Sequence, residues 1–387
     1  APFGRPGEQI YAVSRYEDVK RILHEPGTFS SRFGTPAAKP SPELVERLRE
    51  VIAEGWPNVP TMLTEDAPTH TRYRRLVSMA FTPKRVNELE PAIRSICTEL
   101  VDGFGGAERI DFLNSFAVAL PVRAVAVILE VPETRQAEFK KWADSSVAAI
   151  GRTISDDERV AAERDIVEQQ QYFASEIDDR RTNPRDDFLT DLLNAEVPAA
   201  DDVEGGPLGM AEMLSIIRQI QVAGSETTAS LLADAMVQLA KHPDEWERLK
   251  ADPSRAPLVV EEALRWASPN QGLFRIVTAD TEVAGTPIPK GSTIWVMYGS
   301  ADHDDRLFDD PEEFRPDRPG LNQHIAFGHG IHFCLGAALA RLEAVTALKV
   351  LASRIDTMSV VEPDSLRYGS SFILRGLEAL ELDLTYQ

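Results

Sequence analysis

The chain has 387 residues, a formal net charge of −21, 43% hydrophobic residues and 27% charged residues. This composition is typical of a soluble globular protein with enough apolar material for a large core. Because the chain is so acidic, we expect no broad surface for nucleic acid or for an anionic membrane. The apolar runs fall short of the roughly 20 residues of a spanning helix, so no transmembrane segment is predicted.

The chain contains two cysteines, Cys97 and Cys334. So few cysteines exclude a disulfide scaffold and fit a reducing cytoplasm, where we expect the protein to reside. Cys97 lies in an amphipathic helical stretch and is predicted to be a small core residue. The sequence begins at Ala1 without an initiator methionine or a signal-peptide pattern, so we expect it to start part-way into a longer protein.

Secondary-structure signals change along the chain. A short strand is predicted at 9–13, and helical periodicity dominates from about 42 to 267. The later part is predicted to contain strands at 273–277, 293–297 and 380–385 and a final helix from about 335 to 353. We therefore expect one mainly α domain over residues 1–387, with a smaller β-rich part.

The longest predicted helix covers 210–241, about 45–50 Å at 1.5 Å per residue. Within it, the segment from Ala223 to Thr228 contains a glycine, a serine and two threonines, which are poor helix formers. Thr227 can hydrogen-bond back to the carbonyl of Ala223 and loosen the helix, and Gly224 leaves room for a group close to the backbone. Such a break suits water or dioxygen beside a metal, although a tolerated kink in a core helix explains the same residues.

Cys334 lies in a glycine-rich segment from Phe327 to Gly336, directly before the final predicted helix. Glycines permit tight turns and the close approach of a flat macrocycle, and a helix N-terminus favours the thiolate that binds iron. The residues alone leave other interpretations open. Cys334 could be a buried cysteine in a turn, a nucleophile with His332 or His329 as its base, or a zinc ligand, although the usual zinc spacing is missing.

Several charged side chains require partners of opposite charge. Glu262 and Arg265 are one helical turn apart and can pair on one face. His70 and Arg74 also share a helix face, which suits a carboxylate partner, although neighbouring arginines leave a solvated basic face as an alternative. Arg275 lies inside an apolar strand and needs a polar or charged partner.

The motifs of this chain and their order along it resemble those of the cytochrome P450 superfamily. The resemblance covers the chain from about Gln9 to its end. Residues 327–336 fill the signature Phe-x-x-Gly-x-Arg/His-x-Cys-x-Gly, and residues 262–265 match Glu-x-x-Arg. Residues 314–318 match Phe-x-Pro-x-Arg, and residues 223–228 match Ala/Gly-Gly-x-Asp/Glu-Thr-Thr/Ser. The resemblance implies the P450 fold, with haem between the long central helix and the cysteine-loop helix. The chain departs from the family before its first strand, where relatives have further residues.

The resemblance implies haem b (iron protoporphyrin IX) as the cofactor and Cys334 as its metal ligand. Arg318 is expected to join Glu262 and Arg265 in a buried charge network of structural importance. The other cofactor-binding residues that the resemblance implies are His70, Arg74, Ala223, Gly224, Arg275, Phe327, Gly328, His332 and Gly336.

The resemblance further implies an oxidoreductase, a haem-thiolate monooxygenase, in which Glu226 and Thr227 are the catalytic pair. Two electrons and two protons must reach dioxygen before its O–O bond breaks heterolytically, and the thiolate pushes electron density toward the oxygen. Thr227 would hold the oxygen and a water by hydrogen bonds, while Glu226 would relay protons from solvent.

The expected substrate is an apolar or amphipathic organic molecule that becomes hydroxylated, epoxidised or dealkylated. Each pocket residue that the resemblance implies is explained equally well as core packing. These residues are Met62, Leu63, Gln219, Asn270, Leu273, Phe274, Ser371 and Phe372, together with the region 148–154.

The sequence contains no visible flavin, nicotinamide or iron–sulfur motif, so electrons from NAD(P)H must arrive through a partner. We expect a ferredoxin with its reductase, or a reductase domain once fused after Gln387. Basic side chains such as Arg341 are expected to form the docking patch. The alternatives are a peroxide-driven peroxygenase, a non-enzymatic haem sensor or carrier, and a cysteine hydrolase that uses Cys334.

Overall fold

The computed structural model describes residues 2–3, 10–33, 41–78, 81–148, 150, 154–197 and 206–387. The chain forms two compact units. Unit 1 consists of Ala1–Ser30, Pro83–Pro121 and Glu226–Gln387, and unit 2 consists of Ser31–Thr82 and Val122–Ser225.

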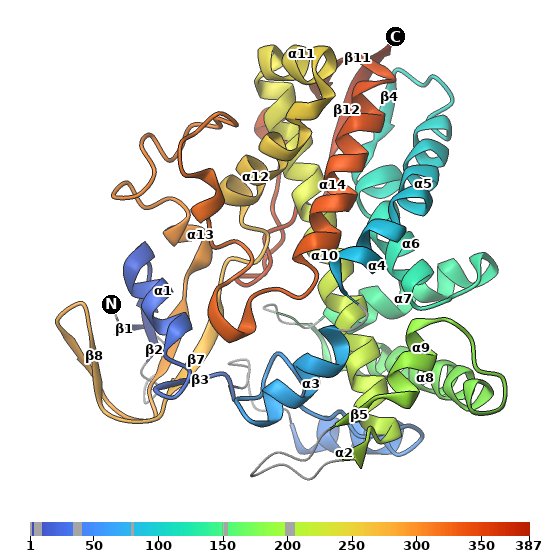
Figure 1. Ribbon diagram of the computed structural model, residues 1–387, viewed down its shortest axis with the longest axis vertical. Helices are drawn as coiled ribbons and strands as arrows, with labels where there is room; N and C mark the ends of the chain where they lie inside the picture. Colours follow the sequence, from blue (N-terminus) through green and yellow to red (C-terminus); the bar gives the residue numbers. More distant parts are fainter. Residues whose placement is uncertain are drawn as a thin grey trace. The chain divides into compact units, whose positions relative to one another are not determined.

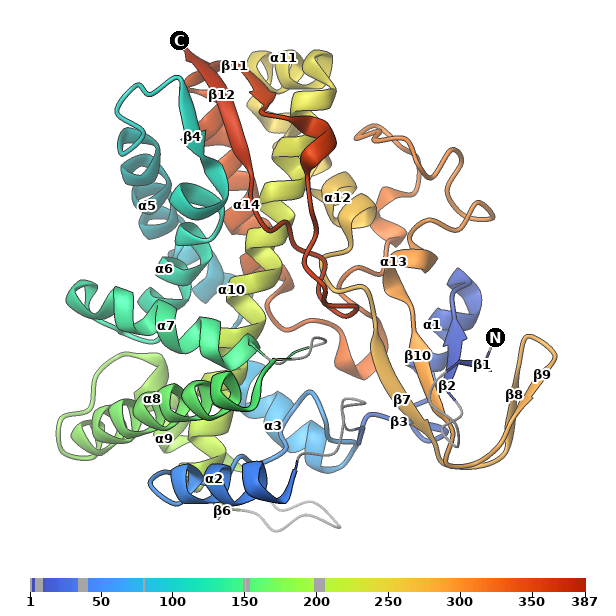
Figure 2. The ribbon, with the colours of Figure 1, turned by 180° about the vertical axis from the view of Figure 1, so that it is seen from behind.

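The main sheet of unit 1 joins segments that are far apart in the sequence. Its strands, in spatial order, are β1 (Pro2–Phe3), β2 (Ile10–Val13), β10 (Thr293–Val296), β7 (Leu273–Val277) and β3 (Phe29–Ser30). β10 runs parallel to β2 and antiparallel to β7, and Figure 2 shows β7 and β10 as neighbours. The predicted strands at 273–277 and 293–297 are confirmed, and the first predicted strand begins at Ile10, since Gln9 lies outside the described residues.

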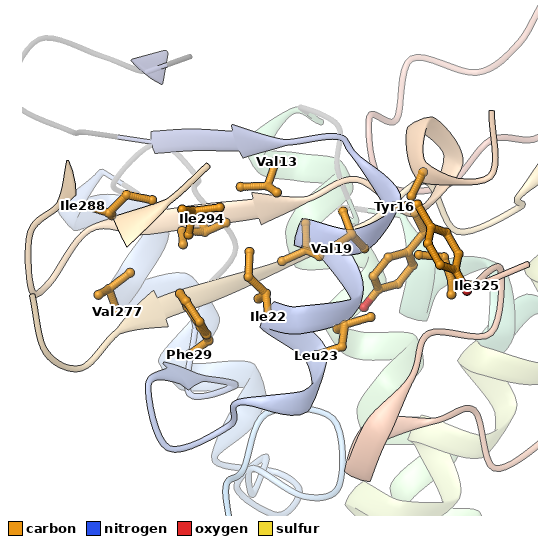
Figure 3. Close-up of a cluster of buried hydrophobic side chains, with 14 residues drawn as sticks. Val13, Tyr16, Val19, Ile22, Leu23, Phe29, Val277, Ile288, Ile294 and Ile325 are labelled. Carbon is orange, nitrogen blue, oxygen red and sulfur yellow. The ribbon is translucent and has the colours of Figure 1, made fainter. Parts of the chain in front are cut away.

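Helix α1 (Tyr16–His24) supplies the apolar cover of this sheet. Figure 3 shows Val19 and Ile22 pointing from α1 toward Ile294 and Phe29 of the strands. All four side chains are fully buried, and burial of each contributes about 1.5–3 kcal/mol. These contacts fix the C-terminal turn of α1, which in turn contacts the cysteine loop described below.

A second sheet of unit 1 contains the last strand of the chain. It has the order β11 (Ile355–Val360), β12 (Glu381–Tyr386), β4 (Arg109–Asp111), all antiparallel. The predicted strand at 380–385 is confirmed with a shift of one residue. The small hairpin of β8 (Thr281–Val283) and β9 (Thr286–Ile288) extends from the main sheet, as seen in Figure 1.

The helices follow the predicted dominance of helical periodicity. Unit 1 contains α4 (Pro83–Glu88), α5 (Glu90–Asp102), α11 (Pro243–Ala251), α12 (Ala256–Ala267), α13 (Tyr298–Ala301) and α14 (Ala337–Ala352). Unit 2 contains α2 (Pro42–Ile52), α3 (Thr69–Ser78), α7 (Gln136–Val147), α8 (Asp156–Thr182), α9 (Phe188–Asn194) and the pair β5 (Glu196–Val197) and β6 (Gly206–Pro207). α6 (Ala119–Ile128) and α10 (Met210–Lys241) contribute residues to both units.

Short helical turns complete the chain. They are η1 (Leu113–Ala117), η2 (Glu133–Arg135), η3 (Pro253–Arg255), η4 (Leu321–Gln323), η5 (Gly330–His332) and η6 (Pro363–Ser365). Within the described part of the chain, no helix combines the length and apolarity needed to cross a bilayer.

Helix α10 has the predicted bounds and remains one α-helix through residues 223–228. The loosening of the helix by Thr227 stays a prediction. Ser225 inside this segment and Ser230 just after it make the back-bonds expected of hydroxyl side chains in a helix, since Ser225 Oγ donates to the Gln221 carbonyl and Ser230 Oγ donates to the Glu226 carbonyl, both at 2.9 Å.

A buried acid lies between α14 and α5, which pack against each other. Glu343 of α14 is 1% exposed, and its Oε2 atom has no hydrogen-bond partner among the described residues. Burial raises the pKa of Glu343 to about 8. The nearby Cys97 of α5 is also fully buried, and burial raises the pKa of its thiol to about 12 with a smaller contribution from Glu343, which supports the prediction of a core cysteine.

We predict that Glu343→Gln stabilises the protein increasingly as pH rises from 4.5 to about 8. In this window the unfolded chain loses the carboxyl proton while the folded chain retains it, so the free energy of unfolding of the parent protein falls with pH. The difference should reach on the order of 3–5 kcal/mol, at roughly 1.4 kcal/mol per pKa unit.

Chemical unfolding at acid and mildly alkaline pH measures this difference. The control is Glu90→Gln at an exposed acid of α5 that pairs with Arg94. A Glu343→Gln variant whose advantage over the parent stays constant with pH would contradict the buried neutral carboxyl.

Candidate functional site

The loop before α14 holds Cys334 by backbone geometry. The Cys334 amide donates to the Phe327 carbonyl at 2.9 Å, and Cys334 is partly buried. Gly328 and Gly330 have φ values of 68° and 70°, in the left-handed region that favours glycine. Helix α14 begins at Ala337 with Gly336 as its N-cap, two residues later than predicted, and Cys334 precedes the helix as predicted.

The glycines of this loop differ in their physical role. A Cβ atom on Gly330 would lie 2.3 Å from the carbonyl oxygen of Leu23, at the end of α1. A Cβ atom on Gly336 would meet no atom closer than Cys334 Sγ at 4.0 Å. Gly330 therefore lets the loop backbone approach the end of α1 closely. The sequence did not reveal this reason for a glycine at the position.

The predicted charge network behind the loop is confirmed. The carboxylate of Glu262 accepts two hydrogen bonds from Arg265, each 2.8 Å long, and all of these side chains are fully buried. Arg318 Nε lies 3.5 Å from Glu262 Oε1, and its terminal nitrogens donate to backbone carbonyls of Asp310 and Glu313. A buried ion pair of this kind is stable only when its remaining hydrogen-bonding groups are also satisfied.

Arg275 of β7 is the second feature of unit 1. It is 3% exposed and donates to the Phe274 carbonyl at 2.7 Å. Its other neighbour is the buried hydroxyl of Tyr298, which lies 3.8 Å from the position of a Cβ atom on Gly328 in the cysteine loop. No carboxylate of the described residues pairs with this guanidinium, so a buried cation lies next to the loop with a polar partner but no counter-charge.

In unit 2, α3 carries the predicted cationic face. His70 is 2% exposed, and burial together with the neighbouring Arg74 lowers its pKa. Arg72 points elsewhere, since it pairs with Glu212 at 3.0 Å, and the Tyr73 hydroxyl donates to the same carboxylate at 2.6 Å. The interpretation of α3 as a uniformly solvated basic face is therefore wrong for His70 and Arg72.

Helix α10 carries the residues that were predicted to serve oxygen activation. Ala223 is exposed although much of the surrounding helix is buried, and Glu226 and Thr227 are partly buried. A Cβ atom on Gly224 would lie 2.8 Å from a methyl carbon of Val125 in α6. Glycine is thus required at this position by helix packing, whereas the sequence interpretation assigned it to making room for a cofactor.

These side chains fit a haem. In unit 1, its iron would take the half-buried Cys334 thiolate, and its carboxylates would suit Arg275. Three or more His, Cys, Asp or Glu side chains grouped to hold a metal ion do not occur in the described ranges, so these residues offer no geometry for the zinc interpretation.

The predicted substrate residues lie in both units. In unit 2, Met62 is buried, Leu63 is 43% exposed and Gln219 accepts a hydrogen bond from Thr61 at 3.2 Å. Of the predicted region 148–154, residues 149 and 151–153 lie outside the described residues.

In unit 1, Phe274 is buried and Phe372 is 41% exposed, with the two rings edge to face at 6.0 Å. Leu273 is partly buried. Asn270 and Ser371 accept hydrogen bonds from nearby backbone amides, so their side chains already stabilise local turns.

Sequence reasoning missed the partners of Arg341. Its guanidinium donates twice to Glu261, at 2.5 and 2.8 Å, and lies 4.6 Å from the centre of the Phe327 ring. The expectation that Arg341 offers a docking charge is not supported, because this charge is already paired. No local signal could have revealed the pair, since its members are 80 residues apart.

The comparisons with known proteins agree in one family. The sequence model of the family described as Cytochrome P450 matches residues 157–356. The chain is 36% identical to Cytochrome P450 107B1 of Saccharopolyspora erythraea, over 97% of this chain and 89% of that protein. It is 35% identical to the 6-deoxyerythronolide B hydroxylase of the same organism, over 98% and 91% of the two chains. The solved structure of CYP109Q5 from Chondromyces apiculatus is similar with a TM-score of 0.83 and 36% identity, over 97% and 90% of the chains.

We predict that Gly330→Ala destabilises the protein by at least about 2–3 kcal/mol, because the new methyl would strain a left-handed residue and collide with backbone of α1. Gly336→Ala is the matched control, since its Cβ atom would meet nothing closer than 4.0 Å. Thermal unfolding of both purified variants checks this, and equal melting temperatures would show that α1 does not press on the loop.

Proposed function

The chain belongs to the cytochrome P450 family and is a monooxygenase, and from this premise we propose that Cys334 binds the iron of its haem and that Glu226 and Thr227 serve oxygen activation. The family implies a haem, and we propose haem b. The observation that carries the proposal is the Cys334 loop, in which two left-handed glycines and the amide bond to Phe327 hold a half-buried thiol before α14.

Bound haem supplies the redox chemistry by which one atom of dioxygen is inserted into a substrate. Cys334 contributes a thiolate, and the amides at the start of α14 favour its negative charge. Arg275 would orient the group by binding a carboxylate, because a buried cation that has no counter-charge among the described residues gains most from an anionic ligand. His70 and Arg74 are proposed as further carboxylate-binding residues.

Glu226 and Thr227 move protons in this proposal. They are adjacent on α10, and both are partly buried. Thr227 holds a water or the oxygen by hydrogen bonds, and Glu226 passes protons inward as a general acid. The presence of this pair favours dioxygen over peroxide as the oxidant.

The proposed substrate is an apolar or amphipathic organic molecule. In unit 1, the exposed side chain of Phe372 and the partly buried Leu273 support apolar contacts. The name of one relative, a 6-deoxyerythronolide B hydroxylase, supports hydroxylation as the reaction. Electrons would come from NAD(P)H through a ferredoxin and its reductase or through a reductase domain, in the cytoplasm.

Cys334→Ser tests the ligand. We predict that this variant loses the thiolate signature in the reduced carbon monoxide difference spectrum, because an alcohol does not replace a thiolate as an electron donor to iron. Cys97→Ser, at the buried core cysteine, is the control and should keep the signature. An unaltered band in the Cys334→Ser protein would end the assignment.

Thr227→Ala tests the proton pair. This variant should still bind haem, but it should release NADH electrons mostly as hydrogen peroxide, with product per NADH falling by roughly tenfold or more. Thr228→Ala, at the buried neighbour, is the control. An unchanged yield per NADH would remove Thr227 from the mechanism, and full turnover with peroxide alone would indicate a peroxygenase.

A further inference from the structure

Helix α12 carries two adjacent carboxylates that bind different groups. Glu262 holds the buried arginines described above, whereas Glu261 accepts two hydrogen bonds from Arg341 of α14, at 2.5 and 2.8 Å. His324, which precedes the cysteine loop, contacts Glu261 Oε2 through Nε2 at 3.0 Å. We call Glu261, His324 and Arg341 the Glu261 cluster.

The hydrogen-bond pattern fixes the tautomer of His324. Its Nδ1 atom accepts from the Ala326 amide at 3.3 Å, so Nε2 carries the hydrogen and donates to Glu261. Burial alone would raise the pKa of Glu261, but the hydrogen bonds from Arg341 and His324 outweigh it and lower the pKa to about 2. The carboxylate is therefore charged at neutral pH and binds both partners.

The chain around His324 is fixed from a second direction. The carboxyl of Asp302 accepts from the Ile325 amide at 2.7 Å and from Ser268 Oγ at 2.9 Å. Asp302 is fully buried, so these bonds are protected from water. The segment that enters the cysteine loop is thus held by acids from two elements.

The Glu261 cluster reaches Cys334 through Phe327. The Arg341 guanidinium lies 4.6 Å from the centre of the Phe327 ring, and the His324 ring lies 6.1 Å from it. The Phe327 carbonyl in turn accepts the Cys334 amide at 2.9 Å. Cation–π contact and packing therefore fix the residue whose backbone fixes the cysteine.

We propose that Glu261, His324 and Arg341 are positioning residues for Cys334, which act through Phe327 and set how firmly the loop presents its sulfur. This role deepens the proposed function and rests on it only in taking Cys334 as the iron ligand. Arg341 then serves inside the molecule, in place of the docking role that the sequence suggested.

The variants Glu261→Gln and Arg341→Met test the proposal in the purified holoprotein. The control is Glu245→Gln, since Glu245 also accepts from two arginines, Arg248 and Arg255, and has a similarly exposed side chain, 15% against 20% for Glu261. The first readout is amide hydrogen exchange of residues 324–334, and the second is the reduction potential of the haem.

Both test variants should increase exchange of the loop amides by roughly ten- to hundredfold, because each breaks charge-assisted hydrogen bonds. The potential should rise in Glu261→Gln, which leaves the Arg341 cation without its counter-charge, and fall in Arg341→Met, which leaves the carboxylate. Glu245→Gln should change neither quantity.

The proposal would be overturned if either readout, the amide exchange of the loop or the reduction potential of the haem, stayed at the Glu245→Gln value in both test variants. Should Glu261→Gln fail to fold, Arg341→Met decides, since this side chain is 35% exposed and its loss leaves a smaller defect. An unaltered carbon monoxide band in Cys334→Ser would refute the ligand assignment, but it would not change the loop exchange expected in Glu261→Gln and Arg341→Met. The two failures are therefore distinguishable.

Discussion

The cysteine loop depends on ion pairing by helix α12, whose adjacent carboxylates Glu261 and Glu262 bind arginines from distant parts of the chain. Glu262 fixes the segment after α13, and Glu261 ties the entrance of the loop to α14. The charges of Glu262 and its arginines are fully buried and are costly unless each is paired and hydrogen-bonded, so loss of one of these partners should be far more damaging than loss of a surface pair. The loop backbone, in which Gly328 and Gly330 have left-handed conformations, then positions the thiol of Cys334.

The arginines of unit 1 that pair with a carboxylate of the protein have a different role from Arg275, which pairs with none among the described residues. Arg265 and Arg341 bind carboxylates of the protein, so their role is internal. Arg275 is buried like Arg265, yet its neighbours in the described residues are a carbonyl and the Tyr298 hydroxyl. A cation that has no counter-charge among the described residues, next to the loop of the proposed metal ligand, is suited to an anionic ligand such as a haem carboxylate.

Helix α14 combines both kinds of constraint. Its first turn follows Cys334, Arg341 secures it to α12, and Glu343 lies in its contact with α5. Because burial keeps Glu343 protonated in the folded state while the unfolded chain ionises, the free energy of unfolding falls as pH rises toward about 8. The same helix therefore links the support of the proposed metal ligand to the pH dependence of stability.

The sequence by itself determined the family, the bounds of α10 and the residues of the Cys334 loop, because these are written as local motifs with fixed spacing. It also gave the Glu262–Arg265 pair, since one helical turn separates the two side chains. Only the tertiary structure showed why Gly330 is required and which carboxylate binds Arg341. The physical reason is that these outcomes depend on contacts between segments far apart along the chain, where spacing carries no information about which side chains meet.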